Sequence, residues 1–360
     1  MATDVVVIGG GVIGLATAHE LLRLGARVTI LERSYCGKES SWAGGGILSP
    51  LLPWDYHDSV TQLVQLSNKL FPKLVEELRQ ETGISPEYQT CGMLVLSDVK
   101  NTQDDAVKIW CDRNIFSIKN LSPHEIVPEL TWDKSALWLP AVAQVRSPRF
   151  LQALKKSVEL SGGIISEHVE VKSWKFKHAH VESVITSQGE HVAQHYIVAA
   201  GAWSQEVLSE YALKMNVYPV RGQMLLFRAP LGLLKTIVFH NGFYLIPRQD
   251  GHILAGSTME NVGFNKNITN DAREELLAKT RTLLPMLTEE MLVGHWAGLR
   301  PGSYGNIPII SRHPVITNLY LNSGHHRYGV TMAPGSAHLL SKTVINNLPS
   351  LDSAPYHWPN

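Results

Sequence analysis

Three glycines and one glutamate near the start of the chain have the types and spacing needed to bind a dinucleotide. Gly9, Gly11 and Gly14 form the pattern Gly-x-Gly-x-x-Gly, and Glu32 follows one β-α-β length later. Gly9 allows a tight turn, Gly11 lets the backbone approach a pyrophosphate, and Gly14 lets a helix pack closely on a strand. The amino terminus of that helix offers free N–H groups and a partial positive charge to the phosphates. Because Glu32 can accept both ribose hydroxyls, the pattern predicts a dinucleotide without a 2′-phosphate; a purely structural glycine turn is the alternative.

A second glycine-rich segment, Ser-Ser-Trp-Ala-Gly-Gly-Gly-Ile, lies at residues 40–47. It suits a ligand that extends beyond the pyrophosphate, whereas its other interpretation is a mobile surface loop. On these residues alone, both NAD and FAD fit the dinucleotide.

Arginine and tyrosine side chains in the second half of the chain are candidates for binding a small carboxylate. The guanidinium of Arg300 is a planar fork that matches a carboxylate, and its Gly- and Pro-bracketed segment predicts a loop. A surface salt bridge is the alternative role for Arg300. Tyr244 lies beside a hairpin turn, where its hydroxyl either reaches the same carboxylate or lies in the core. Arg327 adds positive potential near a ligand or has a structural role.

The histidine pairs do not indicate a metal site. Neither His325-His326 nor His178-x-His180 has Asp, Glu or Cys at a recognisable ligand spacing. The sequence therefore predicts no bound metal.

Length and composition limit the class of protein. The 360 residues, 44% of them hydrophobic and 18% charged, suggest two globular domains. Lys and Arg number 32, as do Asp and Glu, so no net charge attracts nucleic acid or an anionic membrane. Three scattered cysteines exclude a disulfide framework and favour a reducing cytoplasm. Because the chain has neither a run of about 18 apolar residues nor a basic secretory segment, we expect a cytoplasmic protein without a membrane span.

The elements that position these residues begin with a β-α-β unit. It consists of a strand at 4–8, a helix from residue 12 that stops at Gly25, and a strand at 27–31. Residues 34–54 predict a loop, and residues 122–140 a connection punctuated by proline. Other helices are expected at 59–81, 103–113, 148–160 and 271–284, and other strands at 92–97, 163–174, 181–186, 195–200, 217–227 and 319–322.

Two turn signals predict an antiparallel meander in the middle of the chain. Asn241-Gly242 and Asp250-Gly251 separate alternating β-runs, which predicts strands at 236–239, 243–248 and 252–257. A closing helix is expected at 334–346, because Pro334 suits a first helical turn. A parallel start and an antiparallel middle together predict two interleaved architectures.

Motifs along nearly the whole chain resemble the D-amino-acid oxidase superfamily of FAD enzymes. The resemblance begins with the glycine fingerprint, the loop at 40–47 and Ile-Val-Ala-Ala-Gly-Ala-Trp-Ser at 197–204. Pro-Val-Arg-Gly-Gln at 219–223 is similar to the strand with which these enzymes enter the substrate domain. The segments most similar to the glycine-oxidase branch, which serves the thiamine pathway, are Phe-Tyr-Leu-Ile-Pro-Arg at 243–248, Ala-Gly-Ser-Thr-Met at 255–259, Trp-Ala-Gly-Leu-Arg-Pro-Gly at 296–302 and Gly-His-His-Arg-Tyr-Gly at 324–329.

The resemblance implies a fold and a set of site residues. The fold is α/β, with a Rossmann-like FAD-binding domain at 1–83, 145–215 and 300–360. An α+β substrate domain with an antiparallel sheet takes 84–144 and 216–299. The residues implied in cofactor binding are Gly9, Gly11, Val12, Ile13, Gly14, Glu32, Arg33, Ser40, Ser41, Gly45, Gly46, Ile47, Val171, Gly201, Trp203, His325, His326, Arg327, Tyr328, Gly329, Val330 and Thr331. Arg300, Tyr244 and Arg327 are the implied catalytic-site residues.

The resemblance also implies an activity, the oxidative deamination of glycine, small amines or D-amino acids. In that family a hydride passes from the substrate Cα to the flavin, and water hydrolyses the imine to an α-keto acid and ammonia. Oxygen then accepts the electrons and gives hydrogen peroxide. A dehydrogenase that passes electrons from a D-amino acid to another acceptor is the alternative. The implied partners are a small amino-acid or amine substrate and oxygen, and the resemblance is compatible with a homo-oligomer.

Three features depart from the relatives in this resemblance. Ile47 stands where the branch often has Met, and Gly242 stands where a polar residue is common, so both change the wall of the pocket. Related sarcosine oxidases attach flavin to a cysteine in the C-terminal half, whereas this chain has no cysteine after Cys111. We therefore expect non-covalent FAD.

Overall fold

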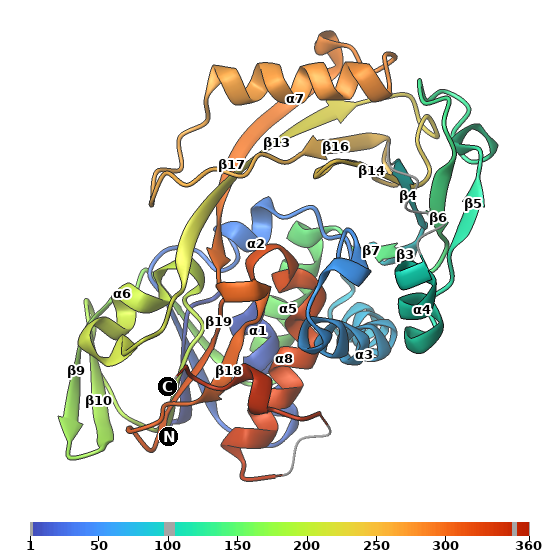
Figure 1. Ribbon diagram of the computed structural model, residues 1–360. Coiled ribbons are helices and arrows are strands. Elements are labelled where there is room, and N and C mark those ends of the chain that lie inside the picture. Colours follow the sequence, from blue (N-terminus) through green and yellow to red (C-terminus); the bar gives the residue numbers. More distant parts are fainter. Residues whose placement is uncertain (1–2, 97–104, 348–350, 360) are drawn as a thin grey trace.

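The computed structural model describes residues 3–96, 105–347 and 351–359, and two large sheets organise this part of the chain. One lies in the lower half of Figure 1, and the other arches above it. The strands of the lower sheet, in their order across it, are β18 (Ile309–Arg312), β19 (Leu319–Ser323), β12 (Ala193–Val198), β1 (Thr3–Ile8), β2 (Val28–Glu32) and β8 (Ile164–Glu167).

The predicted β-α-β unit forms the centre of this lower sheet. β1 pairs in parallel with both β2 and β12, and the helix between β1 and β2 is α1 (Val12–Arg23). The last four residues of β1 and all of β2 are buried, as expected for parallel strands covered on both faces. Gly25 follows the helix with a φ of 88°, which fits its predicted role as the stop.

Each face of the lower sheet has its own hydrophobic core. Alternate residues of β1, such as Val5 and Val7, pack with helices α1, α3 (Asp58–Thr82), α5 (Ser147–Leu160) and α8 (Gly329–Val344). The other alternate residues pack against a three-stranded antiparallel sheet. Its strands are β9 (Val171–Lys177), β10 (His180–Thr186) and β11 (Gly189–His191).

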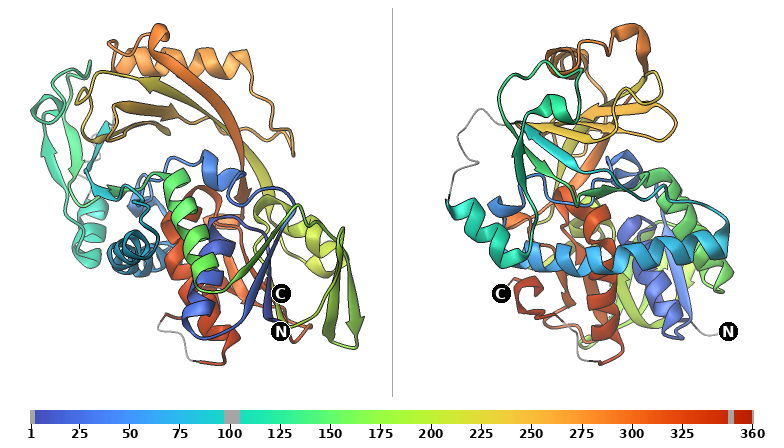
Figure 2. Two further views of the ribbon diagram at one scale, coloured as in Figure 1. Left: turned by 180° about the vertical axis from the view of Figure 1, so that it is seen from behind. Right: turned by 90° about the vertical axis from the view of Figure 1, so that its right-hand side faces the viewer.

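The upper sheet has eight strands and is largely antiparallel. In their order across it, they are β17 (Leu292–Gly302), β13 (Tyr218–Arg228), β16 (His252–Gly256), β15 (Phe243–Pro247), β14 (Ile237–His240), β4 (Met93–Leu96), β6 (Ala136–Leu139) and β5 (Lys119–Leu121). Helix α7 (Asn270–Leu283) covers its outer face, as both views in Figure 2 show. The inner face carries a second core that is turned toward the lower half of the molecule.

The predicted meander is confirmed as β14, β15 and β16. Asn241 and Gly242 both have positive φ values, 46° and 81°, as a type I′ hairpin turn requires. Short elements complete the described chain: α2 (Ser40–Ala43), α4 (Asp105–Asn114), α6 (Ser204–Leu208), the pair β3 (Gln89–Thr90) and β7 (Ala143–Gln144), and 3₁₀ turns at Pro53–Asp55, Pro123–Glu125, Gly201–Trp203, Ser209–Ala212, Glu289–Met291, Tyr304–Asn306, His326–Tyr328 and Ala354–Tyr356.

Several expected boundaries were wrong. The single strand expected at 163–174 is two strands in different sheets, because His168 turns the chain with a φ of 60°. The loop expected at 34–54 contains α2, and the connection expected at 122–140 contains β6. The closing helix starts at Gly329, so Pro334 lies inside it. The end of the strand expected at 92–97 and the start of the helix expected at 103–113 lie outside the described residues.

The two sheets draw their strands from separate sets of segments. The lower sheet uses residues 3–32, 164–198 and 309–323, and the upper sheet uses residues 93–139 and 218–302. We propose that the two domains follow this division, with the boundaries given in the sequence analysis except at residues 300–302, which complete β17 of the upper sheet. No helix in the described residues has the length and apolar character required to cross a membrane.

Candidate active site

One cavity collects the predicted site residues from both halves of the molecule. Every residue implied in cofactor or substrate contact lines it, apart from Gly14. The lining comes from the loop after β1, the end of β2, the segment around α2, the turn after β12, strands β13, β15 and β17, and the start of α8. Residues far apart in the sequence therefore meet at one site.

The first glycine loop is fixed by close packing. Gly9 has a φ of 109°, and a Cβ there would lie 2.5 Å from the Ala199 carbonyl oxygen. A Cβ on Gly14 would lie 1.9 Å from the Gly9 carbonyl oxygen. The same Cβ would lie 3.4 Å from Val7 Cγ1 of β1, so Gly14 lets α1 pack closely on this strand, as predicted, without lining the cavity. Helix α1 has no side-chain cap, and the Val12 N–H donates to Ser41 Oγ at 3.0 Å.

Glu32 lies at the end of β2 with its carboxylate turned back to the loops. The side chain is buried, and Oε2 accepts the Gly10 N–H at 2.8 Å. Oε1 accepts the Ser34 N–H at 2.9 Å. These two bonds fix the carboxylate at the cavity wall.

The second glycine loop is anchored rather than mobile. Arg248 Nη2 donates to the Gly45 carbonyl at 2.6 Å, and Ser147 Oγ donates to the Gly44 carbonyl at 2.8 Å. Gly46 has a φ of 73°, and a Cβ there would lie 2.1 Å from the Val145 carbonyl oxygen. The loop therefore has a defined place on the cavity wall.

Trp203 lines the same cavity beside the first loop. The Arg33 guanidinium carbon lies 3.9 Å from its ring centroid, and the Phe264 ring stacks with it at 5.5 Å. Arg33 also lines the cavity and pairs with Glu39 Oε1 at 3.1 Å, so these contacts give the wall a flat guanidinium and ring surface whose charge is balanced.

The start of α8 faces the cavity through residues 329–331, preceded by the turn at His326–Tyr328. The Nδ1 atoms of His325 and His326 are buried and have no partner in the described residues. Burial lowers the pKa of His325 to about 3. Burial, together with Arg300 and Arg327, lowers the pKa of His326 to about 4. Both imidazoles are neutral near pH 7, and their free nitrogens can serve a polar ligand.

Arg300 lies in strand β17, not in the loop that the sequence predicted. It pairs with Val220 of β13, and its side chain is partly buried on the cavity wall. Nη2 donates to Ser257 Oγ at 2.7 Å and Nη1 to the Thr258 carbonyl at 3.2 Å. Burial lowers the pKa of Arg300 and Arg327 lowers it further, whereas Tyr244 acts in the opposite direction.

Neither guanidinium of this wall has an ion-pair partner among the described residues. Arg327 Nη2 donates to the Gly242 carbonyl at 3.3 Å, and Arg300 contacts neutral oxygens. Tyr244 is buried beside them, and its hydroxyl lies 3.4 Å from Met224 Sδ. Two such cations beside one hydroxyl attract a small anion, and Arg300 forms no surface salt bridge with any residue that the structure describes.

Sequence reasoning did not assign several residues that also line the cavity. They include Glu39, Ala43, Leu51, Glu206, Gly222, Met224 and Gly298. Ala43, Gly222 and Gly298 had a signal, since they belong to the motifs at 40–47, 219–223 and 296–302. The others had none, because their place in the cavity depends on the packing of distant segments.

Comparisons with known proteins agree with this geometry. Residues 4–343 match the family model described as FAD dependent oxidoreductase. A glycine oxidase from Pseudomonas aeruginosa is 42% identical over 99% of this chain and 98% of that protein. The bifunctional protein ThiO/ThiG of Synechocystis is 31% identical over 96% of this chain and 52% of that protein.

Solved structures show the same likeness. The crystal structure of glycine oxidase from Geobacillus kaustophilus matches with a TM-score of 0.93 and 28% identity, over 99% of this chain and 98% of that one. An iminodiacetate oxidase from Chelativorans sp. matches with a TM-score of 0.88 and 25% identity, over 98% of each chain. These findings confirm the resemblance and the α/β fold that it implied. With a family match that spans almost all of its length, this chain belongs to the FAD-dependent oxidoreductases.

Proposed function

We propose that the protein oxidatively deaminates glycine and other small amines or D-amino acids. Glycine, oxygen and water would give glyoxylate, ammonia and hydrogen peroxide. The observation that carries this proposal is the pair of guanidinium groups without ion-pair partners, Arg300 and Arg327, in the same cavity as the dinucleotide fingerprint. The relatives named glycine oxidase support it.

The cavity residues fit FAD, the cofactor of the family. The loop after β1 and the amino terminus of α1 would hold the pyrophosphate, with Glu32 at the ribose. The second glycine loop and the start of α8 would hold the ring system, where the unpartnered Nδ1 of His326 can meet a polar group. Bound FAD supplies the acceptor for the hydride that leaves the substrate Cα.

The chain's own residues would bind and orient the substrate. Arg300 would pair with the carboxylate, because it keeps donors available beside its bonds to Ser257 and Thr258. The Tyr244 hydroxyl would donate to the same carboxylate. Arg327 would add positive potential at this end of the cavity.

No acidic side chain among the described residues forms an ion pair with Arg300 or Arg327. The glutamates that line the cavity, Glu32, Glu39, Glu170 and Glu206, form no hydrogen bond or ion pair with Arg300 or Arg327 in the described part of the chain. His326 is neutral near pH 7 because of its lowered pKa. A substrate amine that binds in its neutral form needs no base, so orientation and positive potential are the chain's contribution to hydride release.

The main test is spectroscopic. The purified protein should be yellow, glycine should bleach the flavin under anaerobic conditions, and oxygen should restore the colour with one peroxide per glyoxylate. An enzyme that bleaches with glycine but reoxidises slowly in oxygen and rapidly with a quinone would be the dehydrogenase. Protein that binds no flavin, or whose bound flavin no small amine or D-amino acid bleaches, would contradict both functions.

The carboxylate assignment is tested by substitution. Arg300→Met should leave FAD bound and lower kcat/KM for glycine by roughly 30- to several-thousand-fold, the effect of about 2–5 kcal/mol for a lost buried charge pair. Tyr244→Phe should cost about 0.5–1.5 kcal/mol, as for a neutral hydrogen bond. The control is Arg228→Met, at an exposed arginine of β13 in the same sheet. Unchanged KM in Arg300→Met would refute the assignment.

We further propose a cytoplasmic location, oxygen as the acceptor, and a place in the thiamine pathway. The three cysteines are all free thiols, which suits a reducing compartment. The similarity to proteins named ThiO/ThiG supports the pathway assignment. Homo-oligomers remain compatible with the family resemblance.

A further inference from the structure

The guanidinium of Arg300 occupies space that exists because residue 222 is glycine. A Cβ on Gly222 would lie 2.1 Å from Arg300 Nη2 and 2.3 Å from its Cζ. Gly222 is not among the residues with positive φ, so its backbone suits any amino acid. The glycine is therefore needed for room rather than for conformation, and the guanidinium lies against bare backbone of β13.

Two hydrogen bonds hold one edge of the same guanidinium. Arg300 Nη2 donates to Ser257 Oγ and Nη1 donates to the Thr258 carbonyl, and both acceptors lie in the segment that follows β16. These acceptors are neutral, so they orient Arg300 without neutralising it. The position of Thr258 thus fixes the direction in which the cation points.

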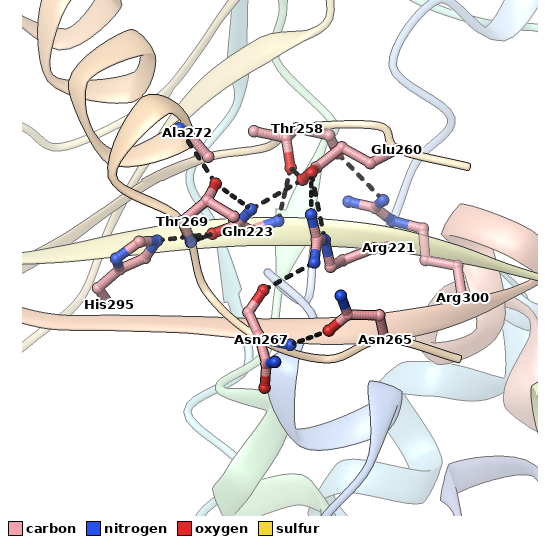
Figure 3. Close-up of polar contacts among 10 residues, drawn as sticks. All are labelled: Arg221, Gln223, Thr258, Glu260, Asn265, Asn267, Thr269, Ala272, His295 and Arg300. Carbon is pink, nitrogen blue, oxygen red and sulfur yellow. Dashed lines mark hydrogen bonds and ion pairs between the residues drawn. The ribbon is translucent and has the colours of Figure 1, made fainter. Parts of the chain in front are cut away.

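Thr258 is held in turn by Glu260, as Figure 3 shows. The Thr258 hydroxyl donates to Glu260 Oε1 at 2.5 Å and accepts the Gln223 N–H at 2.9 Å. Gln223 Nε2 donates to the same carboxylate oxygen at 2.9 Å. Arg221 Nη2 pairs with Glu260 Oε2 at 2.5 Å.

Arg221 and Gln223 stand on either side of Gly222 in β13 and are almost fully buried. Because side chains alternate along a strand, both point to the face opposite the one that Gly222 leaves open. Backbone bonds of 2.9 Å in each direction join Arg221 to Glu260. One short stretch of strand therefore provides the space for the guanidinium and the anchor for the segment that directs it.

We propose that Arg221-Gly222-Gln223, acting with Glu260, is the positioning element for Arg300 and sets the affinity for the substrate carboxylate. Gly222 and Glu260 are its positioning residues. This inference rests on the proposed function of Arg300 as the carboxylate clamp.

The test uses Gly222→Ala and Glu260→Gln in the FAD-loaded protein, with acetate as the carboxylate probe. Gly222→Ala should be tolerated by the fold, because its new Cβ meets the far end of a flexible side chain, which can move. Glu260→Gln keeps the size of the side chain and removes its charge. Acetate binding is read from the flavin absorbance change, and flavin content and urea unfolding are measured beside it.

Each variant should weaken acetate binding about ten- to a hundredfold, the range for the loss of one charge-assisted hydrogen bond, and leave flavin content unchanged. KM for glycine should rise as the affinity for acetate falls, while kcat changes less. Gly294→Ala in β17 is the control, since its Cβ meets only ordinary contacts at 3.4 Å. Glu289→Gln, at a surface ion pair with Arg273, controls for the loss of a carboxylate.

Both substitutions are repeated in an Arg300→Met background to separate the two proposals. If the element acts through Arg300, neither substitution should weaken acetate binding further there. Additive losses in that background, or wild-type acetate affinity in both single variants, would overturn the inference and leave the clamp intact. Arg300→Met with unchanged acetate affinity would instead overturn the proposed function.

Discussion

Arg248 gives a sharp test of what stabilises the wall of the cavity. Its guanidinium is buried and forms no ion pair in the described residues. It donates instead to Gln144 Oε1 at 2.5 Å, the Val145 carbonyl at 3.1 Å and the Gly45 carbonyl at 2.6 Å. Burial lowers the pKa of Arg248 to about 10, so the group is still a cation at pH 7.

Arg248→Met should destabilise the protein by about 2–4 kcal/mol. Three buried acceptors lose their donor, at a cost of about 1–3 kcal/mol each, and relief from burying a cation offsets part of that cost. The comparison is Arg146→Met, which removes a partly buried arginine that pairs with both Glu87 and Asp250. That change should cost at most about 1 kcal/mol, because both ion pairs are still within reach of water, which weakens them.

Equilibrium urea unfolding of both variants, with and without FAD, measures these free energies. Flavin fluorescence on titration should also show weaker FAD binding in Arg248→Met, since Gly45 loses its anchor. An argument from the number of ion pairs would predict the opposite, that Arg146→Met is the less stable of the two variants. An Arg146 variant that loses as much stability as the Arg248 variant would refute the argument from burial.

Three further predictions follow from the site. Acid precipitation should release all yellow colour, because no cysteine follows Cys111, and flavin left in the pellet would contradict non-covalent binding. Burial lowers the pKa of His325 in the folded protein to about 3, against about 6.5 in the unfolded chain, so protonation of the unfolded chain destabilises the fold as the pH falls below 6.5. His325→Gln should therefore reduce the loss of unfolding free energy between pH 7 and pH 5 by about 2 kcal/mol in urea unfolding, and an unchanged loss would contradict this reasoning. Gly329→Val should lower the flavin midpoint potential and slow anaerobic reduction by glycine. The reason is that a larger side chain at the first turn of α8 separates the N–H groups of that turn from the cavity. An unchanged potential in FAD-replete protein would show that this turn serves packing alone.

The parts predicted well from sequence are those that local chemistry decides. The meander was placed within one residue at each end, because the Asn241-Gly242 turn specifies its own backbone. The glycine fingerprint likewise predicted a strand, a turn and a helix, since Gly9 and Gly14 are excluded from carrying a Cβ by neighbouring backbone. In both cases the signal and its cause lie within a few residues.

The parts predicted wrongly depend on distant partners. Strand β17 contains Gly294, Gly298 and Gly302, which weaken a strand in isolation. Gly298, Pro301 and Gly302 bracket Arg300, and this bracket led to the loop expected there. The pairing of β17 with β13 along ten registered residue pairs overrides that preference. Two of the glycines are spacers: a Cβ on Gly298 would lie 2.6 Å from Ala43 Cβ, and one on Gly302 2.6 Å from the Tyr218 ring.

Helix α8 was misplaced for a related reason. Pro334 is favourable in a first turn, but a proline inside a helix is tolerated when its neighbours meet the polar groups that it frees. Here the helix packs deeply in the lower core, and the Gly335 N–H donates to Ser67 Oγ of α3 at 3.0 Å. Tertiary packing extends the helix to Gly329, which brings its amino terminus to the cavity wall.

Gly298, one of the two spacer glycines of β17, lies between the two ends of the site. Gly298 lets β17 touch the second glycine loop at Ala43, and Trp296 Nε1 donates to the Ala43 carbonyl at 3.2 Å. Arg300 follows two residues later on the same strand, so the position of the clamp is set relative to the loop that would hold the cofactor. A Cβ on Gly298 would lie 2.6 Å from Ala43 Cβ, so a larger residue would push β17 away from this loop. The contact explains why glycine is required at position 298 although it makes no polar bond, and it sets the distance between the proposed carboxylate clamp and the proposed cofactor loop.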